Sequence, residues 1–477
     1  MIEINSIRKL KINLSDYDFH KDIRNRLLMS RFSSFDMLVL EEILYSSIKI
    51  SIKKLAREID AEEEKLILSL EKLKKMQLIT FDEDLIYVDK NMRKYFEFEI
   101  LKFEDDFFPD MKFFQSILKK VPIHVIPTWY SIPRSTNNIF ESIIEKYLLT
   151  PQLYYRYLSE YNPSDPVLKN IIDEVSKAKD FQKPAAEIRK KYSLSDEQFE
   201  EYMLYLEYSC LCCITYVKKK DHWIEMITPY REWRDYLKFL EKTKTPPIKE
   251  QNDIERKFLN DFAFIENMSL CLLLAKKKPL LLIEKADDFS LSKETLQTFQ
   301  KKCKSLKLNS DEIEKHIKSL IEKLCMLKLG DKVDDHFYAL EGANQWLDLS
   351  IEDKALHIYR HPLNQLLSSR LSSDLCSERN IREAEKSIVR VLDSGWIYFD
   401  DFIHGVTVPI SEKSHVMLKR HGNAWRYDIP KYDESEKHLI KKTIFNWLFE
   451  IGIIAKAIHK DKDCFCVTDF GRKLFAT

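Results

Sequence analysis

Glycine is scarce in this chain, with only 7 among 477 residues. Rossmann and P-loop domains need Gly-rich turns, because a residue without a Cβ lets the backbone approach a phosphate closely. The chain also has no Walker A sequence. These absences argue against a nucleotide-driven motor, and they favour a mainly helical protein with short strands.

The chain has no excess of charge of either sign, since 77 basic side chains balance 77 acidic ones. A protein held to nucleic acid mainly by its overall charge is usually basic. Any nucleic-acid contact must therefore come from local patches. The neutral balance also favours protein partners.

Long apolar runs are missing as well. The most apolar stretch, Leu270–Ala275, is separated by three lysines and a proline from residues 280–283, whereas a membrane-spanning helix needs about 20 apolar residues. The first 20 residues lack the apolar core of a secretory signal. The 9 cysteines are scattered among apolar neighbours and do not form a disulfide framework. We expect a cytoplasmic protein with reduced thiols and no membrane partner.

No catalytic or metal-binding motif stands out. His357 and His361 are four apart, but a zinc protease would need Glu where Ile358 stands. The cysteine pairs lack the two-residue gap that is usual for a tetrahedral zinc site; they are Cys210, Cys212, Cys213, Cys464 and Cys466. We therefore predict no catalytic site, no metal, no cofactor and no enzymatic activity, although a site assembled from distant residues stays open.

Residues 33–98 give the clearest structural pattern. Apolar residues recur at helical spacing in three stretches, and a brief alternation at residues 48–52 indicates a short strand. Asp60 and Glu63 have the spacing of a capping box at the start of the third helix. Residues 78–88 then predict two strands around a polar turn. This order is typical of a winged helix, a helix-turn-helix domain followed by a β-wing.

The same pattern recurs three more times, and repetition is stronger support than any single copy. Capping boxes at Ser195–Gln198 and Asn309–Glu312 mark two of the later third helices, and Gly330-Asp331 is expected to be a wing turn. We predict a mainly α fold with small β-wings, built as a tandem array of about four winged-helix units at residues 33–98, 165–240, 253–350 and 384–477. Around them we expect a leading segment at 1–32, an aromatic and Pro-rich helical connector at 99–164, a polar linker at 241–252 and a helical connector at 351–383.

Three short motifs in residues 255–477 resemble bacterial helicase-associated winged-helix modules, which are related to the N-terminal region of XPB-type DNA repair helicases. The resemblance rests on Gly342, Trp346, Leu347, Leu349 and Ser350, on Gly395, Trp396, Ile397, Phe399 and Phe402, and on Thr468, Gly471 and Arg472. It implies a non-catalytic module in DNA repair, transcription or helicase regulation, and it carries no catalytic residues.

Local basic clusters are the candidates for nucleic-acid binding. They are Lys218, Lys219 and Lys220 in the second wing, Lys65, Lys72 and Lys75 on the third helix of the first unit, and Lys419, Arg420 and Arg426 beside aromatic residues. The alternative for each is a solvated charged face. The third helix of the second unit carries five acidic residues that face no lysine in its sequence, so we expect it to bind protein or to pack.

The function we predict is a non-enzymatic DNA-associated adaptor, accessory to a helicase, repair or transcription machine. Its partners would be DNA, through local basic patches, and a protein such as a helicase or another nucleic-acid-processing complex. The alternative is a protein–protein scaffold with no nucleic-acid contact.

Overall fold

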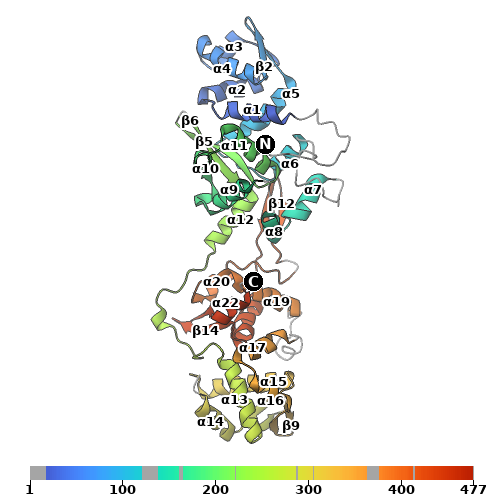
Figure 1. The fold of residues 1–477 in the computed structure, drawn as a ribbon, viewed down its shortest axis with the longest axis vertical. Helices are drawn as coiled ribbons and strands as arrows, with labels where there is room; N and C mark the ends of the chain where they lie inside the picture. The colour runs from blue at the N-terminus through green and yellow to red at the C-terminus, as the bar shows by residue number, and fades with distance from the viewer. Residues whose placement is uncertain are drawn as a thin grey trace. The chain divides into compact units, whose positions relative to one another are not determined.

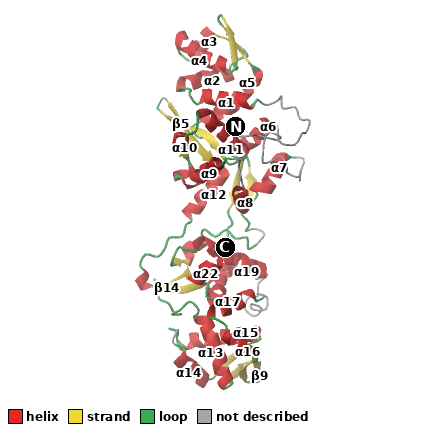
Figure 2. Cartoon of the chain, in the orientation of Figure 1, coloured by secondary structure: helices red, strands yellow, loops and turns green. Residues whose placement is uncertain are grey.

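The computed structural model describes residues 18–120, 138–160, 165–220, 222–285, 288–303, 306–361, 375, 377–411 and 414–475. It is mainly helical with small antiparallel sheets, which confirms the coarse fold class (Figure 2). The chain divides into two compact units: unit 1 takes in Met1–Lys238 and Met417–Asp428, and unit 2 takes in Phe239–Val416 and Ile429–Thr477. Among the described residues, no helix combines the length and apolar character needed to cross a bilayer.

Module 1 opens unit 1. After α1 (Phe19–Met29) it comprises α2 (Ser34–Tyr45), β1 (Lys49–Ser51), α3 (Ile52–Glu58), α4 (Glu63–Lys75), β2 (Ile79–Asp82), β3 (Leu85–Val88) and α5 (Lys90–Glu99), and the short helix η2 (Ile100–Phe103) follows. The sheet order is β1-β3-β2. Buried apolar side chains of α2, α3 and α4 form its core, as the helical spacing predicts.

Module 2 follows a helical connector made of α6 (Met111–Lys120), α7 (Ile139–Ile143), η4 (Ile144–Leu148) and α8 (Pro151–Glu160). The module comprises α9 (Pro166–Lys177), β4 (Lys183–Pro184), α10 (Ala185–Tyr192), α11 (Asp196–Tyr208), β5 (Cys212–Lys219), β6 (His222–Pro229) and α12 (Arg231–Lys242). Its sheet has the order β4-β6-β5. β5 runs through Lys219, so Lys218 and Lys219 lie in the strand and not, as expected, in the turn.

Module 3 lies in unit 2, and its helices lie together in the ribbon drawing (Figure 1). It comprises α13 (Ala263–Lys277), β7 (Leu280–Lys285), β8 (Asp288–Leu291), α14 (Lys293–Lys302), α15 (Ser310–Met326), β9 (Gly330–Val333), β10 (His336–Ala339) and α16 (Gly342–Asp348), and α17 (Ile351–Arg360) follows. The sheet order is β8-β7-β10-β9. The prediction of a turn at Gly330-Asp331 is wrong, because both residues lie in β9 and the bend comes at Asp334, whose φ is 48°.

Module 4 completes unit 2. It comprises α19 (Glu378–Lys386), η7 (Ser387–Val391), β11 (Ile397–Tyr398), α20 (Phe399–Ile403), α21 (Glu434–Lys442), η8 (Thr443–Leu448), β14 (Ile454–His459), β15 (Lys462–Val467) and α22 (Asp469–Phe475). The sheet order is β11-β15-β14. Between α20 and α21 the chain forms the hairpin β12 (Met417–His421) and β13 (Ala424–Asp428), which packs in unit 1.

All four modules share one sheet topology. The first strand pairs with the third, and the third pairs with the second, always in antiparallel fashion. In every module two α-helices lie between the first and second of these strands. Module 3 adds the strand β8 there, and module 4 adds the β12–β13 hairpin. The third strand is therefore the central one each time, and the second and third strands form the hairpin.

Helix caps show how local sequence sets these elements. The capping boxes at Ser195 and Asn309 are confirmed, since each side chain and its partner three residues on exchange both hydrogen bonds. The predicted cap at Asp60 is wrong: Glu62 takes the N-cap position without a side-chain bond, and Asp60 has a φ of 48° in the turn after α3. A left-handed turn residue is frequently Asp, because its short side chain tolerates that conformation.

Candidate nucleic-acid interface and pocket

A helix-turn-helix domain reads the major groove with its recognition helix, so the exposure of the third helix in each module bears on the predicted DNA contact. In module 2 that helix, α11, is covered: Phe199, Met203, Leu204 and Leu206 are fully buried. Even Glu200 and Glu207 are buried. Helix α11 therefore packs and does not present a reading face, which agrees with the expectation from its acidic sequence.

The burial of Glu207 depends on cations from other segments. Glu207 does face cations: both guanidinium ends of Arg26 donate to its carboxylate at 3.0 and 3.1 Å, and the Lys102 ammonium lies 2.9 Å away. Burial alone would raise the pKa of the Glu207 carboxyl, but the charges of Arg26 and Lys102 hold it below its ordinary value. These cations come from α1 and η2, so the cluster ties α11 to the segments that flank module 1.

Module 3 hides its third helix to the same degree, whereas module 1 leaves its own free. On α15, Ile313, Ile317, Leu320, Ile321 and Leu324 are buried, and Lys323 forms a buried ion pair with Glu450 of module 4. On α4, by contrast, Ile67 and Leu68 are 40% and 68% exposed. Of the two, only α4 has a whole face open to a ligand.

The three predicted lysines of α4 have different surroundings. Lys72 donates to the buried carboxylate of Asp36 at 2.6 Å, so its charge is already paired and it holds α4 against α2. Lys65 is exposed and its ammonium lies 4.2 Å from the Phe35 ring centroid. Lys75 is exposed at the C-terminal end of the helix. Lys65 and Lys75 remain available to a phosphate, and Lys72 does not.

The β5–β6 hairpin ends in an exposed basic tip. Lys218, Lys219 and Lys220 are all exposed, and Lys220 occupies the turn with a φ of 56°. No ion pair involves any of the three within the described part of the chain. The Lys218 ammonium lies 5.8 Å from the ring centroid of Trp223, its cross-strand partner. The tip thus concentrates three lysine charges that no carboxylate among the described residues pairs.

The β12–β13 hairpin brings the remaining predicted cations together. In the register of the two strands Lys419 lies opposite Arg426, and Arg420 lies opposite Trp425. Asp428 partly balances this tip, at 3.5 Å from Lys419 and 3.7 Å from Arg426. All three predicted cations are exposed.

Main-chain and ring contacts anchor that hairpin in unit 1. The Leu418 amide donates to the Leu149 carbonyl at 2.8 Å, and the Tyr427 hydroxyl donates to the Leu148 carbonyl at 2.8 Å. Trp425 makes a T-shaped ring contact with Phe140 at 5.8 Å, so it takes part in packing the hairpin.

The histidines and cysteines do not form a reactive centre at the positions that the sequence suggested. The eight described cysteines are free thiols, and burial raises the pKa of Cys212 to about 12, which disfavours the nucleophilic thiolate. His357 has a lowered pKa because it is partly buried and lies near His361. This fits the packing interpretation of both motifs.

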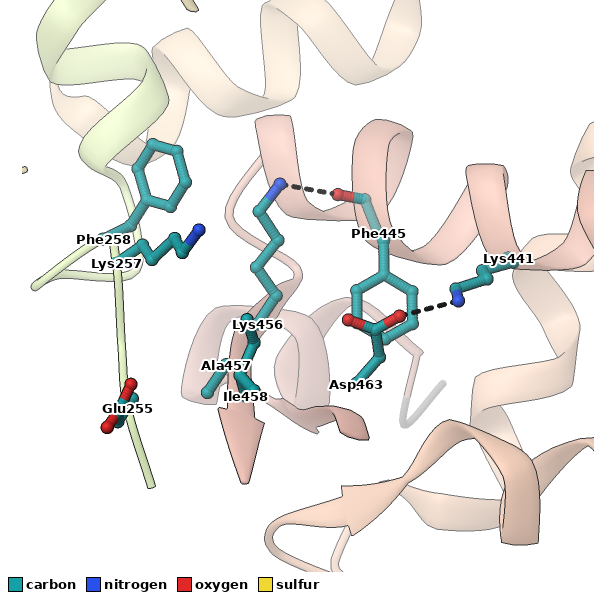
Figure 3. A pocket seen from close by; sticks show the side chains of 9 residues that line it. All are labelled: Glu255, Lys257, Phe258, Lys441, Phe445, Lys456, Ala457, Ile458 and Asp463. Atoms are coloured by element: carbon teal, nitrogen blue, oxygen red, sulfur yellow. Dashed lines mark hydrogen bonds and ion pairs between the residues drawn. The ribbon is translucent and has the colours of Figure 1, made fainter. Parts of the chain in front are cut away.

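One pocket, which the sequence did not indicate, lies in unit 2. It is lined by residues of module 4 and by Glu255, Lys257 and Phe258, which precede module 3 (Figure 3). It has a volume of about 230 Å³, and its lining includes Lys257, Phe258, Lys441, Phe445 and Lys456. Burial, with the nearby Lys257 charge, lowers the pKa of Lys456 to about 8. Its ammonium donates to the Phe445 carbonyl at 3.1 Å.

The other lysines of the pocket are already paired. Lys441 lies 2.6 Å from Asp463, and Lys257 lies 2.5 Å from Glu312. The cavity is also smaller than the ~300–1,000 Å³ that is usual for ligand sites. It could hold a small anion, but it does not have the dimensions of a nucleotide site.

No known protein-family model matches this chain, and no significant match is found among curated proteins.

Proposed function

We propose that the chain is a non-enzymatic DNA-associated adaptor built of four tandem winged-helix modules. The shared strand order supports this interpretation, because the first strand, two helices and the hairpin of each module follow the order of a winged helix. The sequence resemblance of residues 255–477 to helicase-associated modules favours a place beside a helicase, repair or transcription machine. In this proposal the third helices of modules 2 and 3 serve in packing within the chain. The exposed face of the third helix of module 1 can contact DNA or a protein partner.

The exposed β5–β6 tip is the observation that carries the nucleic-acid part of the proposal. Three adjacent lysines without ion-pair partners in the described chain can attract phosphate without first breaking an ion pair there. Lys419, Arg420 and Arg426 form a second exposed basic hairpin in the same unit. DNA contact is thus proposed for hairpin tips of unit 1, with Lys65 and Lys75 of α4 as a further candidate surface.

The protein-scaffold alternative is favoured by a different observation. The open face of α4 carries exposed Ile67 and Leu68 among charges of both signs. An exposed apolar pair on an otherwise free helix fits a protein partner better than a phosphate backbone. The scaffold function and DNA binding therefore predict different consequences for the β5–β6 tip.

Substitution of the lysines at the β5–β6 tip distinguishes the DNA-binding function from the protein-scaffold function. Lys218→Glu, Lys219→Glu and Lys220→Glu together would remove up to three phosphate contacts. Such a loss flattens the slope of log K against log salt by about 2.7 for duplex DNA, and at ~0.1 M salt it weakens binding by roughly two to three orders of magnitude. Fluorescence anisotropy with a labelled 20-base-pair duplex, at several salt concentrations, measures both quantities.

A charge-matched control comes from unit 2. Lys276→Glu, Lys277→Glu and Lys278→Glu change the net charge equally, at a second run of three lysines at the end of α13. We expect this variant to bind DNA nearly as well as the unmodified chain. Equal losses in both triple variants would show only a bulk charge effect, and an unchanged slope in the tip variant would refute the proposed interface. Absence of DNA binding by the unmodified chain at ~0.1 M salt would favour the scaffold.

A further inference from the structure

A strap of chain crosses the edge of the module 4 sheet before module 3 begins. The Ile248 amide donates to the Trp396 carbonyl at 2.8 Å. Seven residues on, Glu255 and Ile458 form an antiparallel bridge in which each amide donates to the other carbonyl, at 2.9 and 3.0 Å. The chain between these two anchors, including the short helix Gln251–Asp253, is held beside the end of β14.

His459, the last residue of β14, has a ring nitrogen without a hydrogen-bond partner among the described residues. The residue is only 2% exposed. Its Nδ1 makes a hydrogen bond of 2.6 Å with the Tyr398 hydroxyl, while its Nε2 is buried with no hydrogen-bond partner among the described residues. A buried polar atom without a partner costs about 1–3 kcal/mol, so it calls for an explanation.

Two carboxylates lie close to the His459 imidazole. Glu250 and Asp253 are exposed on the strap, and the ligand atoms of these two residues and His459 all lie within 4.8 Å of one another. One imidazole nitrogen and two carboxylate oxygens form a donor set that suits Zn²⁺ and similar divalent transition metals. The His459 Nδ1–Tyr398 hydroxyl hydrogen bond fixes the ring in the way that outer partners of metal-bound histidines do: when Nε2 holds the ion, the Nδ1–H group donates to the Tyr398 oxygen.

We propose that Glu250, Asp253 and His459 form a binding site for a divalent transition-metal ion, Zn²⁺ being the representative case. The ion uses the His459 Nε2 lone pair and one oxygen from each carboxylate, and water fills the remaining positions. Because the ligands come from the strap and from β14, the bound ion fastens the strap to the module 4 sheet. The site does not depend on nucleic-acid binding.

Lys460 competes with the ion. Its ammonium lies 2.6 Å from a Glu250 oxygen, and this contact holds the pKa of the Glu250 carboxyl below its ordinary value. Metal binding must break this exposed pair, since an ammonium beside a dication is repelled. Removal of the Lys460 charge should therefore strengthen metal binding, whereas an adventitious surface ion elsewhere would not respond to it.

Isothermal titration of the metal-free full chain with Zn²⁺, and the visible absorption of added Co²⁺, test the site. The variant Glu250→Gln with Asp253→Asn changes only exposed side chains, so its fold should persist even where His459→Gln does not fold. In this double variant we expect the binding of one Zn²⁺ per chain to be lost, or its affinity to fall at least tenfold. The Lys460→Met variant should bind Zn²⁺ severalfold more tightly than the unmodified chain. Tyr398→Phe should weaken binding by about tenfold, as for other outer partners.

Limited trypsin digestion adds a structural readout, because Lys244 and Lys249 lie in or next to the strap. Zn²⁺ should slow cleavage there in the unmodified chain and not in the double variant. If the unmodified chain and the double variant bind Zn²⁺ with equal stoichiometry and affinity, the proposal is overturned. Absence of binding at micromolar Zn²⁺ overturns it too.

Discussion

Replacement of Arg26 by Met should destabilise unit 1 more than the neutralisation of Glu207 in the same buried charge cluster. Arg26 lies 3.1 Å from Asp22 and 3.0 Å from Glu207, and the side chains of all three are at most 4% exposed. The cluster also contains Glu99 and Lys102, which lie 3.0 Å apart. Two cations thus face three carboxylates, for a formal charge of −1 when all are ionised.

The magnitude follows from the charges that each substitution leaves behind. Without Arg26, three buried carboxylates share the single ammonium of Lys102, for a formal charge of −2; loss of one partner from such a buried network costs about 3–5 kcal/mol. Glu207→Gln leaves two cations with two carboxylates and keeps a hydrogen-bonding side chain of similar shape. Its cost should be smaller, about 1–3 kcal/mol.

The assay is urea unfolding monitored by hydrogen exchange of peptides from α1 and α11, because a chain of several modules need not unfold in one step. The matched control is Arg31→Met, just beyond α1, where the Arg31–Asp196 pair is 68% and 54% exposed; an exposed pair contributes at most about 1 kcal/mol. A cost for Arg26→Met below about 1 kcal/mol, or below that of Glu207→Gln, would refute the reasoning.

Two pH-dependent predictions concern buried ionisable groups. Burial raises the pKa of Glu200 to about 8, and neither of its carboxylate oxygens has a hydrogen-bond partner among the described residues. The folded state therefore holds the Glu200 carboxyl proton more tightly than the unfolded state does. The free energy of unfolding falls as the pH rises from the ordinary pKa of glutamate toward 8. Glu200→Gln should therefore gain stability over the unmodified chain between pH 5 and pH 8 in urea unfolding, and an equal difference at both pH values would contradict this. The pKa of Lys456 is lowered to about 8, so its folded form gives up the proton and stability rises between pH 8 and the ordinary lysine value. Lys456→Met should be most stabilising at pH 7 and less so at pH 10, and a gain that grows with pH would count against the buried-amine explanation.

Much of the local structure could be predicted because short-range rules decide it. The capping boxes at Ser195 and Asn309 form as expected, since the donor and acceptor lie three residues apart in the chain. The Thr468–Gly471 motif is likewise local: the Thr468 hydroxyl accepts from the Gly471 amide at 3.0 Å. A Cβ on Gly471 would lie 2.3 Å from the Ile453 carbonyl oxygen, so this glycine is required by close packing.

Errors arose where a residue's role depends on partners far away in the chain. The sequence of α11 has no lysine to balance its acids, but in the fold Glu207 meets a lysine that lies 105 residues earlier. Lys72 was expected on an open face, but it is held by Asp36 from a neighbouring helix. Residues 417–428 gave a basic and aromatic signal, but nothing in their sequence indicated a hairpin that packs in unit 1.

The sequence by itself determined the mainly helical character, the repeated order of helices and strands, and the exposed basic tip, because periodicity, capping and turn chemistry act over a few residues. The tertiary structure alone decided which third helices are covered, which lysines are already paired, and that Glu250, Asp253 and His459 meet. Those properties depend on burial and on distances between segments that the chain brings together only when it folds.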